Sequence, residues 1–527
     1  MNRIVNIYNF IRAVEPRREE ITPEVLYETT ASQVCLLKDR GLPATFALQY
    51  DALLDERYQR LLQDELPAHS EVGAWWEIVQ PHAERAGIAW RGRYPWDWHA
   101  HVGFSPGYAP AEREKLVDVY MEDFRAIFGH YPLSVGSWFI DAHTLGYMAD
   151  RYGVIASCNC KDQVGTDGYT LWGGYWNQAY YPSRRNAYLP AQHEAAQIPV
   201  PVFRMLGSDP VYQYDDGLGT DRQKVLSLEP VYGNSGADPD WVRWFFGFTT
   251  SEPCLAFAYT QAGQENSFTW EKMRRGYEYQ MEYIARLVDE GRIAAMTLAD
   301  CGRWFRSSFP ITPATAVTVT SDWQNRDSRT VWYNSRFYRA NFLWQDGEFR
   351  VRDIHLFDEA YASVYLDEPL TVSTCRYDAL PVVDGFHWSR AEELAGLRFV
   401  ECTSEGERLL PVGDPAVSED GDSVLRLTCA VEDLGQLEIT CRENRLEFRL
   451  AEPARSVDWA LSLHCAREAG LPLESIADTC VTFAHRGHTY QVACSWGQFA
   501  PPEAADQSRL VVLPRDQQII LALENKG

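Results

Sequence analysis

The chain has 527 residues, 46% of them hydrophobic, which is the composition of a folded globular protein too long for a single core. Its formal net charge of −25 argues against nucleic-acid binding, because phosphate recognition requires positive charge. No apolar run approaches a membrane span, and the first residues resemble a strand rather than a signal peptide, so a cytoplasmic protein is expected.

The first 305 residues alternate strand-like and helix-like patterns. Strands are predicted over residues 4–10, 44–49 and 71–78. The first helix should begin at Thr22 and Pro23 and end before Gly41, since the first two residues suit a helix start and glycine suits a helix end. A further helix is predicted over residues 111–128 from its apolar stripe.

The next unit, residues 134–166, is predicted to be a strand, a polar loop, a helix and a second strand. Thr144 is expected to cap the helix, which should run through Tyr152 and end at Gly153. Further strands are expected at 225–228, 255–259 and 294–298. Repeated units of this length predict a parallel (β/α) barrel of seven or eight strands over residues 1–308.

The pattern changes near residue 310. Helical periodicity is lost, and alternating runs such as Leu425, Leu427, Cys429 and Val431 take its place. This alternation predicts an antiparallel β-sandwich domain over residues 309–527, with the domain boundary at about residues 305–320.

Three segments of the first region resemble the NodB-type polysaccharide deacetylases. They are LPATFALQYD at 42–51, HSEVGAWWEI at 69–78 and GSWFIDAHTLGYMADRYGVIA at 136–156. The resemblance implies a barrel-shaped hydrolase acting on carbohydrate. Where the deacetylases carry two metal-binding histidines, this chain has Trp75 or Trp76 and nearby Val79, so no metal or other cofactor is expected.

A barrel of this kind without the metal, followed by a β domain, looks more like the inverting sialidases of glycoside hydrolase family 156. That resemblance implies a histidine and an aspartate as the catalytic pair and an acidic sugar, such as a sialoside, as substrate. His143 matches the histidine, and Glu15 stands by analogy for the aspartate after the first strand.

Strand ends supply the catalytic candidates, since ligands bind at the carboxyl ends of parallel strands. Asp141 and His143 follow a predicted strand, and Glu265 follows another, where it could act as acid or base. The predicted catalytic residues are therefore His143, Asp141, Glu15 and Glu265. The structural alternative is that Asp141 and His143 only cap a helix.

Polar and aromatic residues at strand ends and in long loops are the candidates for sugar binding, because they can bond hydroxyls, stack on rings or pair with a carboxylate. For each, a purely structural role is the alternative. They are Arg12, Arg93, Asp97, His99, His101, Trp138, Trp172, Arg204, Glu229, Gln261, Gln264, Asn266, Asn334 and Arg336.

The sequence thus predicts a metal-independent inverting glycosidase with a carbohydrate partner and no nucleic-acid or membrane partner. A homodimer is left open.

Two other functions stay open. One is a metal-dependent deacetylase or amidohydrolase that uses His99 and His101 as ligands, since their spacing places both on one side of an extended segment. The other is a non-catalytic glycan-binding protein on a degenerate barrel.

Overall fold

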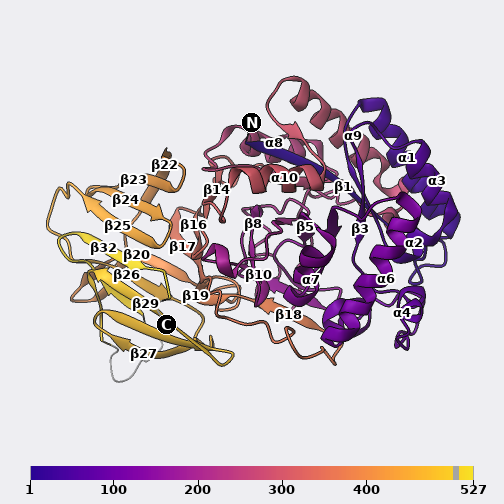
Figure 1. Ribbon diagram of the computed structural model, residues 1–527. Helices are drawn as coiled ribbons and strands as arrows, with labels where there is room; N and C mark the ends of the chain where they lie inside the picture. The colour runs from indigo at the N-terminus through magenta and orange to yellow at the C-terminus, as the bar shows by residue number, and fades with distance from the viewer. Residues whose placement is uncertain (1, 502–509, 526–527) are drawn as a thin grey trace.

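The computed structural model describes residues 2–501 and 510–525 and has an α/β part and an antiparallel β part. The two lie side by side, with the N-terminal α/β part on the right of Figure 1 and the β part on the left. Mixed α/β structure followed by a β-rich region is what the sequence predicts.

A curled, mainly parallel sheet forms the centre of the α/β part. Its strands follow the spatial order β12 (Ala258–Ala262), β1 (Arg3–Ile11), β2 (Thr45–Leu48), β3 (Glu71–Trp75), β4 (Ser134–Gly136), β5 (Ala156–Asn159), β11 (Val202–Arg204) and β8 (Ala179–Tyr180), with β13 (Ala294–Ala295) also on β1. Pairing is parallel from β12 to β11, and β8 is antiparallel to β11. Over the described residues the two end strands do not pair, so the sheet is a half-barrel and the closed barrel is not seen.

Helices pack around this sheet. They are α1 (Pro23–Arg40), α2 (Tyr50–Leu54), α3 (Glu56–Asp64), α4 (Gln80–Arg85), α5 (Ala100–Gly103), α6 (Pro110–Phe128), α7 (Ala142–Tyr152), α8 (Pro239–Ser251), α9 (Trp270–Asp289) and α10 (Leu298–Ser308). As predicted, the Thr22 side chain caps α1 and Gly41 ends it in the left-handed conformation, with φ 63°. None of the helices within the described ranges is long and apolar enough to cross a bilayer.

Several predicted elements differ in the structure. The strand predicted at 255–259 lies at Ala258–Ala262, and the one predicted at 294–298 is shortened to Ala294–Ala295. Helix α7 begins three residues earlier than predicted, at Ala142, because the carboxylate of Asp141 rather than Thr144 caps it. Residues 225–228 form no strand and make only an isolated bridge at Ser227. The Gln213 side chain accepts the N–H of Leu226 at 2.5 Å and so takes a bond that a neighbouring strand would otherwise supply.

Two antiparallel sheets make up the β part. The first contains β14 (Thr315–Val319), β15 (Arg329–Asn334), β16 (Tyr338–Gln345), β17 (Glu348–Leu356), β20 (Gly396–Thr403), β26 (Trp459–His464), β31 (Val511–Leu513) and β30 (Gln498–Phe499), with β19 (Leu380–Asp384) on β17 and β21 (Gly406–Leu409) on β20. The second contains β22 (Val412–Asp420), β23 (Val424–Val431), β24 (Gly435–Arg442), β25 (Arg445–Ala451), β32 (Gln518–Ala522), β29 (His488–Trp496), β28 (Cys480–His485) and β27 (Leu473–Ala477).

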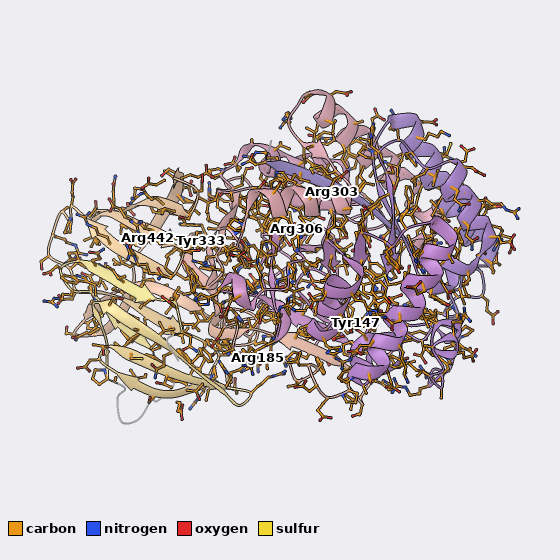
Figure 2. The ribbon with its side chains drawn as sticks, viewed as in Figure 1. Tyr147, Arg185, Arg303, Arg306, Tyr333 and Arg442 are labelled. Atoms are coloured by element: carbon orange, nitrogen blue, oxygen red, sulfur yellow. The ribbon has the colours of Figure 1, made fainter. Side chains whose placement is uncertain are left out.

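Hydrogen bonds from tyrosines join the two sheets. The Tyr333 hydroxyl of β15 donates to the Ser423 carbonyl at 2.9 Å, and the Tyr338 hydroxyl donates to the Arg442 carbonyl at 2.9 Å. Tyr333 and Arg442 lie close together within the β part (Figure 2). Burial alternates along β23, as the sequence pattern predicts for a strand with one face in the core.

One segment of the β part returns to the α/β part. Strand β18 (Cys375–Asp378) pairs in parallel with β7 (Tyr169–Trp172), which pairs with β6 (Gln163–Thr166). Strand β18 lies beneath α7, among the elements of the α/β part (Figure 1). Two short strands, β9 (Pro182–Ser183) and β10 (Asn186–Pro190), form a separate pair. The boundary at 305–320 stays a prediction, and chain on both sides of it builds one shared sheet.

Candidate active site

A cavity of about 710 Å³ opens at the carboxyl ends of the parallel strands. Arg12 follows β1, Glu77 follows β3, Trp138 follows β4 and Glu265 follows β12, and all four line this cavity. Side chains from distant segments meet there because parallel strands end at the same edge of the sheet.

Arg12 joins two buried carboxylates in the cavity. Its Nη2 atom lies 3.3 Å from Glu77 Oε2 and 3.1 Å from Glu265 Oε2. Gln49, at the end of β2, donates to the same oxygen of Glu77 at 2.6 Å. Ser267 donates its hydroxyl to the other oxygen of Glu265. The two carboxylates are therefore held close together, and their orientation is fixed by neutral donors as well as by the arginine.

Glu77 is the acid with the clearest functional signal. Burial raises the pKa of Glu77 to about 7, although the charge of Arg12 opposes the change. Its Oε1 atom is buried and has no hydrogen-bond partner among the described residues. A carboxyl group that is half protonated near neutral pH can donate a proton to a ligand, and a buried carboxyl in a cavity is a functional-site signal.

A third acid, Glu229, lies in the same cavity. It accepts hydrogen bonds from Ser227 Oγ at 2.8 Å and from Gln264 Nε2 at 3.2 Å. Burial raises the pKa of Glu229, while the Ser227 bond and the charge of Lys161 oppose that shift. Gln264, expected to bind substrate, thus orients an acid that lines the cavity.

Glu15, a predicted catalytic residue, supports the site from outside its lining. It binds Arg17 through both oxygens, at 2.9 and 2.8 Å. Burial alone would raise the pKa of Glu15, but the Arg17 hydrogen bonds and the Arg12 charge hold it below its usual value. Glu15 therefore stays ionised and fixes the Arg17 guanidinium over the Trp96 ring, 4.6 Å from its centroid.

Aromatic rings form one wall of the cavity. Trp138, which lines the cavity, meets the rings of Phe10 and Trp75 edge-on at 5.4 and 5.5 Å. Phe10 and Trp75 are buried outside the lining and stack on each other at 3.9 Å between centroids. Trp138 and Trp98 are half-buried and line the cavity. Partly exposed indole faces beside hydrogen-bonding groups suit a ligand with an apolar face and a polar rim, such as a sugar ring.

Two further predicted binding residues stabilise the strands that surround the site. Asn266 accepts the N–H of Arg12 at 3.1 Å and donates to the Arg12 carbonyl at 2.9 Å, so it fixes the end of β1. Gln261 is buried within the sheet and donates to Asn6 Oδ1 at 3.4 Å. Neither lines the cavity.

The structure places Asp141 and His143 away from the cavity lining. Asp141 is fully buried at the start of α7, where it pairs with Arg113 at 2.9 Å and accepts hydroxyl bonds from Ser105 and Thr144, both at 2.6 Å. His143 is 29% exposed and its Nε2 lies 3.1 Å from Glu114 Oε1. These contacts match the helix-capping alternative for Asp141 and leave the catalytic assignment of both residues a prediction.

The loop before α5 brings Asp97 and His99 together. The carboxylate of buried Asp97 lies 2.5 Å from His99 Nδ1, and the exposed Arg93 reaches His99 at 3.2 Å. His101 lies beyond, with its ring 6.2 Å from that of His99. Burial lowers the pKa of His101, and the charge of Arg91 lowers it further.

Four predicted binding residues lie instead at the junction of the two parts. Trp172 donates to Asp384 at 3.1 Å, and Arg204 pairs with Asp162 at 2.8 Å. Asn334 accepts the N–H of Trp176 at 2.8 Å, and Arg336 donates to the Gln192 carbonyl at 3.0 Å. None of the four lines the cavity.

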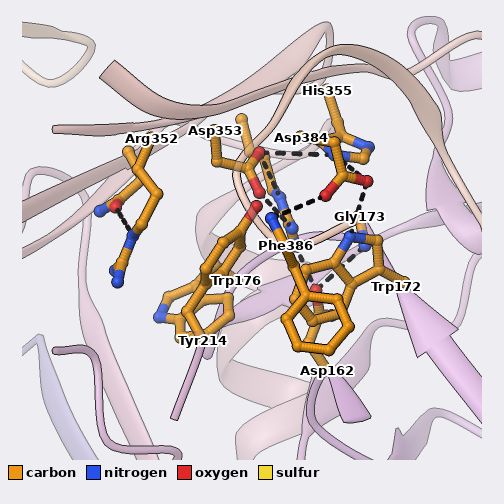
Figure 3. A network of polar contacts seen from close by, with 12 residues as sticks. Asp162, Trp172, Gly173, Trp176, Tyr214, Arg352, Asp353, His355, Asp384 and Phe386 are labelled. Carbon is orange, nitrogen blue, oxygen red and sulfur yellow. Dashed lines mark hydrogen bonds and ion pairs between the residues drawn. The ribbon is translucent and has the colours of Figure 1, made fainter. Parts of the chain in front are cut away.

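That junction contains a buried ionic network. Arg339 of β16 pairs with Asp353 of β17 at 2.7 Å and also binds Asp162, which belongs to the α/β part. Asp162, Asp353 and Asp384 converge there beside Trp172 and His355 (Figure 3). Burial would raise the pKa of Asp162, but the charges of Arg339 and Arg204 hold it below its usual value. The network joins the two parts of the chain.

The residues present do not fit the metal that the deacetylase fold implies. Trp75 packs on Phe10 within the core, and Trp76 and Val79 are also buried. The nearby His82 bonds the Leu116 carbonyl through Nε2 at 2.8 Å. Within the described ranges, no group of three or more His, Cys, Asp or Glu side chains is arranged to hold a metal ion.

Comparison with known proteins gives a likeness of fold. No family model matches the sequence, and no curated relative matches it either. A solved structure of a candidate glycoside hydrolase/deacetylase from Parabacteroides distasonis is 13% identical, with a TM-score of 0.52 over 72% of this chain and 90% of that one. A candidate polysaccharide deacetylase from Mycobacterium smegmatis is 12% identical, with a TM-score of 0.36 over 59% of this chain and 92% of its own. The first likeness shows a shared fold.

Sequence reasoning selected Arg12 but missed Glu77 and the other basic residues that line the cavity. The available signal for Glu77 is its place near the end of the predicted strand 71–78, next to Trp75 and Trp76. The dipeptide Asp167-Gly168 is also a hairpin signal, and it forms the turn between β6 and β7 beside the cavity. Arg222, Lys224 and Lys272 carry no comparable sequence signal, because folding alone brings them to the cavity.

Proposed function

We propose that this protein is a metal-independent glycoside hydrolase that acts on an acidic sugar, such as a sialoside. The observation that carries the proposal is the cavity at the strand ends, where Glu77 and Glu265 pair with Arg12, and Glu229 and aromatic side chains line the same space. Glycoside hydrolysis needs a proton donor for the leaving oxygen and a second group to attack, or to activate water, at the anomeric carbon. The likeness of fold agrees with a carbohydrate-active enzyme.

Glu77 takes the role of general acid in this proposal. Its pKa of about 7 keeps a large share of the group protonated at neutral pH, as proton donation to the leaving oxygen requires. Glu265 takes the role of the second carboxylate, because it lines the same cavity and lies 3.1 Å from the Arg12 nitrogen that also contacts Glu77.

The stereochemistry of the reaction depends on which group acts at the anomeric carbon together with the general acid. The sequence predicts inversion, with His143 activating a water molecule. The pair Glu77 and Glu265 favours retention instead. Both of their Oε2 atoms bind one nitrogen of Arg12, at 3.3 and 3.1 Å, so those oxygens are closer together than the spacing of about 6.5–9.5 Å typical of inverting pairs. In the retaining course Glu265 attacks the anomeric carbon while Glu77 protonates the leaving oxygen.

The charge around the cavity supports an anionic substrate. Six basic and four acidic side chains line it, in a chain whose net charge is −25. The basic excess grows when Glu77 is protonated. A cavity with more basic than acidic side chains attracts anions, whereas the remaining, acidic surface of the protein repels them.

Hydrolysis of a defined panel tests this proposal. Purified protein is incubated with 4-methylumbelliferyl glycosides of N-acetylneuraminic acid, glucuronic acid, glucose and galactose, and the released fluorophore is followed. We expect turnover of an acidic member, loss of at least 100-fold in Glu77→Gln and Glu265→Gln, and full activity in the exposed control Glu271→Gln. Binding of an acidic sugar without any turnover would favour a glycan-binding protein, and turnover that survives both substitutions would refute the assigned roles.

A further inference from the structure

A second cavity, of about 320 Å³, adjoins the first. Trp98, Asp167 and Arg222 line both cavities, so the two open into one groove. A volume of 320 Å³ lies at the lower end of the range for small-molecule sites, which is about 300–1,000 Å³. The groove therefore has room for a ligand longer than the first cavity holds.

The hairpin of β6 and β7 builds the floor of the second cavity. Its turn residues Asp167 and Gly168 have φ of 48° and 77°, as a two-residue hairpin turn of the I′ type requires. Gly165 and Gly168 line the cavity and permit close backbone approach on both sides. A Cβ atom on Gly165 would lie 2.0 Å from the Asp221 carbonyl oxygen, and one on Gly168 would lie 3.0 Å from that of Ser373.

The returning segment of the β part supplies the opposite wall. Ser373 and Thr374, directly before β18, line the second cavity with His99. Backbone hydrogen bonds fix this wall, from Ala100 N–H to the Ser373 carbonyl at 3.1 Å and from Cys375 N–H to the Gly168 carbonyl at 2.9 Å. The second cavity thus exists only because chain from beyond residue 310 crosses back onto the α/β part.

Positive charge is available where the two cavities join. Arg222 is exposed and makes no ion pair with any described residue. The same holds for Arg18, Lys224 and Lys272, which line the first cavity near its opening. By contrast, Arg12 and Arg17 inside the cavity are paired with carboxylates. Free cationic groups at the junction and the opening are therefore available to bind anionic groups of a ligand.

We propose that the second cavity is a further sugar subsite, which takes the unit next to the one bound beside Glu77 and Glu265, with Arg222 binding an anionic group of that neighbouring unit. The substrate class is then an anionic oligosaccharide of two or more units. Trp98, half-buried between the cavities, stacks on the chain at the junction. This inference rests on the proposed function, since it assumes that a sugar occupies the first cavity.

Binding measurements on the full chain test the subsite. The Glu77→Gln protein, used to slow turnover, is titrated by calorimetry with N-acetylneuraminic acid and its α2,8-linked dimer, and with galacturonic and digalacturonic acid. We expect one of the dimers to bind at least 10-fold more tightly than its monomer. Adding Thr374→Trp, which fills the second cavity alone, should abolish that gain and leave monomer affinity within about twofold. Adding Arg222→Ala, which removes a charge that borders both cavities, should abolish the gain as well.

Matched substitutions serve as controls. Ser475→Trp and Arg326→Ala place the same changes at exposed positions outside both cavities and should keep the gain. Circular dichroism establishes that each variant is folded. Equal binding of monomer and dimer, or a gain that survives both Thr374→Trp and Arg222→Ala, would overturn the subsite and leave the proposed function standing. No binding of any acidic sugar, together with no turnover of the glycoside panel, would overturn both.

Discussion

Replacing Glu77 with glutamine removes a buried acid while keeping its size and its hydrogen-bonding oxygen. The wild-type pKa of about 7 lies well above the usual value of 4.5. This difference corresponds to about 3 kcal/mol between the protonated and ionised forms. The Gln49 bond to the Glu77 carboxylate, at 2.6 Å, can persist in the variant because the glutamine oxygen still accepts it.

The sign of the pH dependence follows from proton binding. Between about pH 4.5 and 7 the folded protein keeps a proton on Glu77 that the unfolded chain loses. The free energy of unfolding therefore falls as the pH rises through this interval, by about 3 kcal/mol in total from this one group. The Glu77→Gln protein lacks this loss. Its free energy of unfolding, compared with that of the wild type, should therefore increase by about 3 kcal/mol from pH 5 to pH 8.

Urea denaturation at pH 5 and pH 8, followed by tryptophan fluorescence, measures that gain. The rate profile gives an independent reading, because wild-type kcat/KM should fall above about pH 7 as the general acid ionises. The loss of rate in Glu77→Gln should be smaller for a 4-methylumbelliferyl leaving group than for a sugar, since the phenol needs less protonation. If the free energies of unfolding of the two proteins change with pH by the same amount, the raised pKa of Glu77 is refuted.

A half-buried acid at the other end of β3 provides the control. Glu71 accepts hydrogen bonds from Thr45 and Ser134 and lies outside the cavity. Its replacement by glutamine should alter stability, because buried hydroxyl donors lose a charged acceptor. It should leave the decline of kcat/KM above pH 7 in place. A Glu71→Gln profile without that decline would assign the titration to another group.

Three other outcomes follow from the same site. Turnover should survive dialysis against EDTA, because the sequence resemblance places Trp75 and Val79 where the deacetylases carry metal-binding histidines; complete loss that zinc restores would contradict this. Asp141→Ala should lower the free energy of unfolding by about 3–5 kcal/mol, since it leaves the Arg113 charge buried and unpaired, and chemical denaturation measures this. Proton NMR of the first-formed sugar should show retained configuration, whereas inversion would return the catalytic role to a water-activating group such as His143.

Local sequence signals predicted the repeated units of the α/β part well. The cap at Thr22, the helix end at Gly41 and the strands that became β1 and β2 all depend on neighbouring residues. The same holds for the end of α7 at Gly153, where φ is 71°. Closure of the sheet depends on how the last strands approach the first, and no short pattern encodes that. The sequence therefore indicated a barrel where the structure has an open half-barrel.

Candidate site residues were harder to assign, because partners far apart in the chain decide each role. Arg12, Glu229 and Glu265, which were selected for their position at strand ends, line the cavity, and their roles stay predictions. The same rule selected Asp141, whose charge is neutralised by Arg113 from α6, a contact that strand position does not reveal. Glu77 went unselected because its raised pKa arises from burial in the assembled fold.

The arrangement of charge along the groove gives a physical reason why an acidic sugar would bind at one end of the groove and be cleaved at the other end. Inside the first cavity, Arg12 is shared between Glu77 and Glu265, so a ligand meets little free positive charge there. Near the opening and at the junction with the second cavity, Arg222 and Lys272 are unpaired among the described residues. An anionic group is therefore attracted first to the rim, where water screens it and the cost of desolvation is small. The bond to be cleaved can then lie over the buried acids, where low polarity keeps Glu77 protonated.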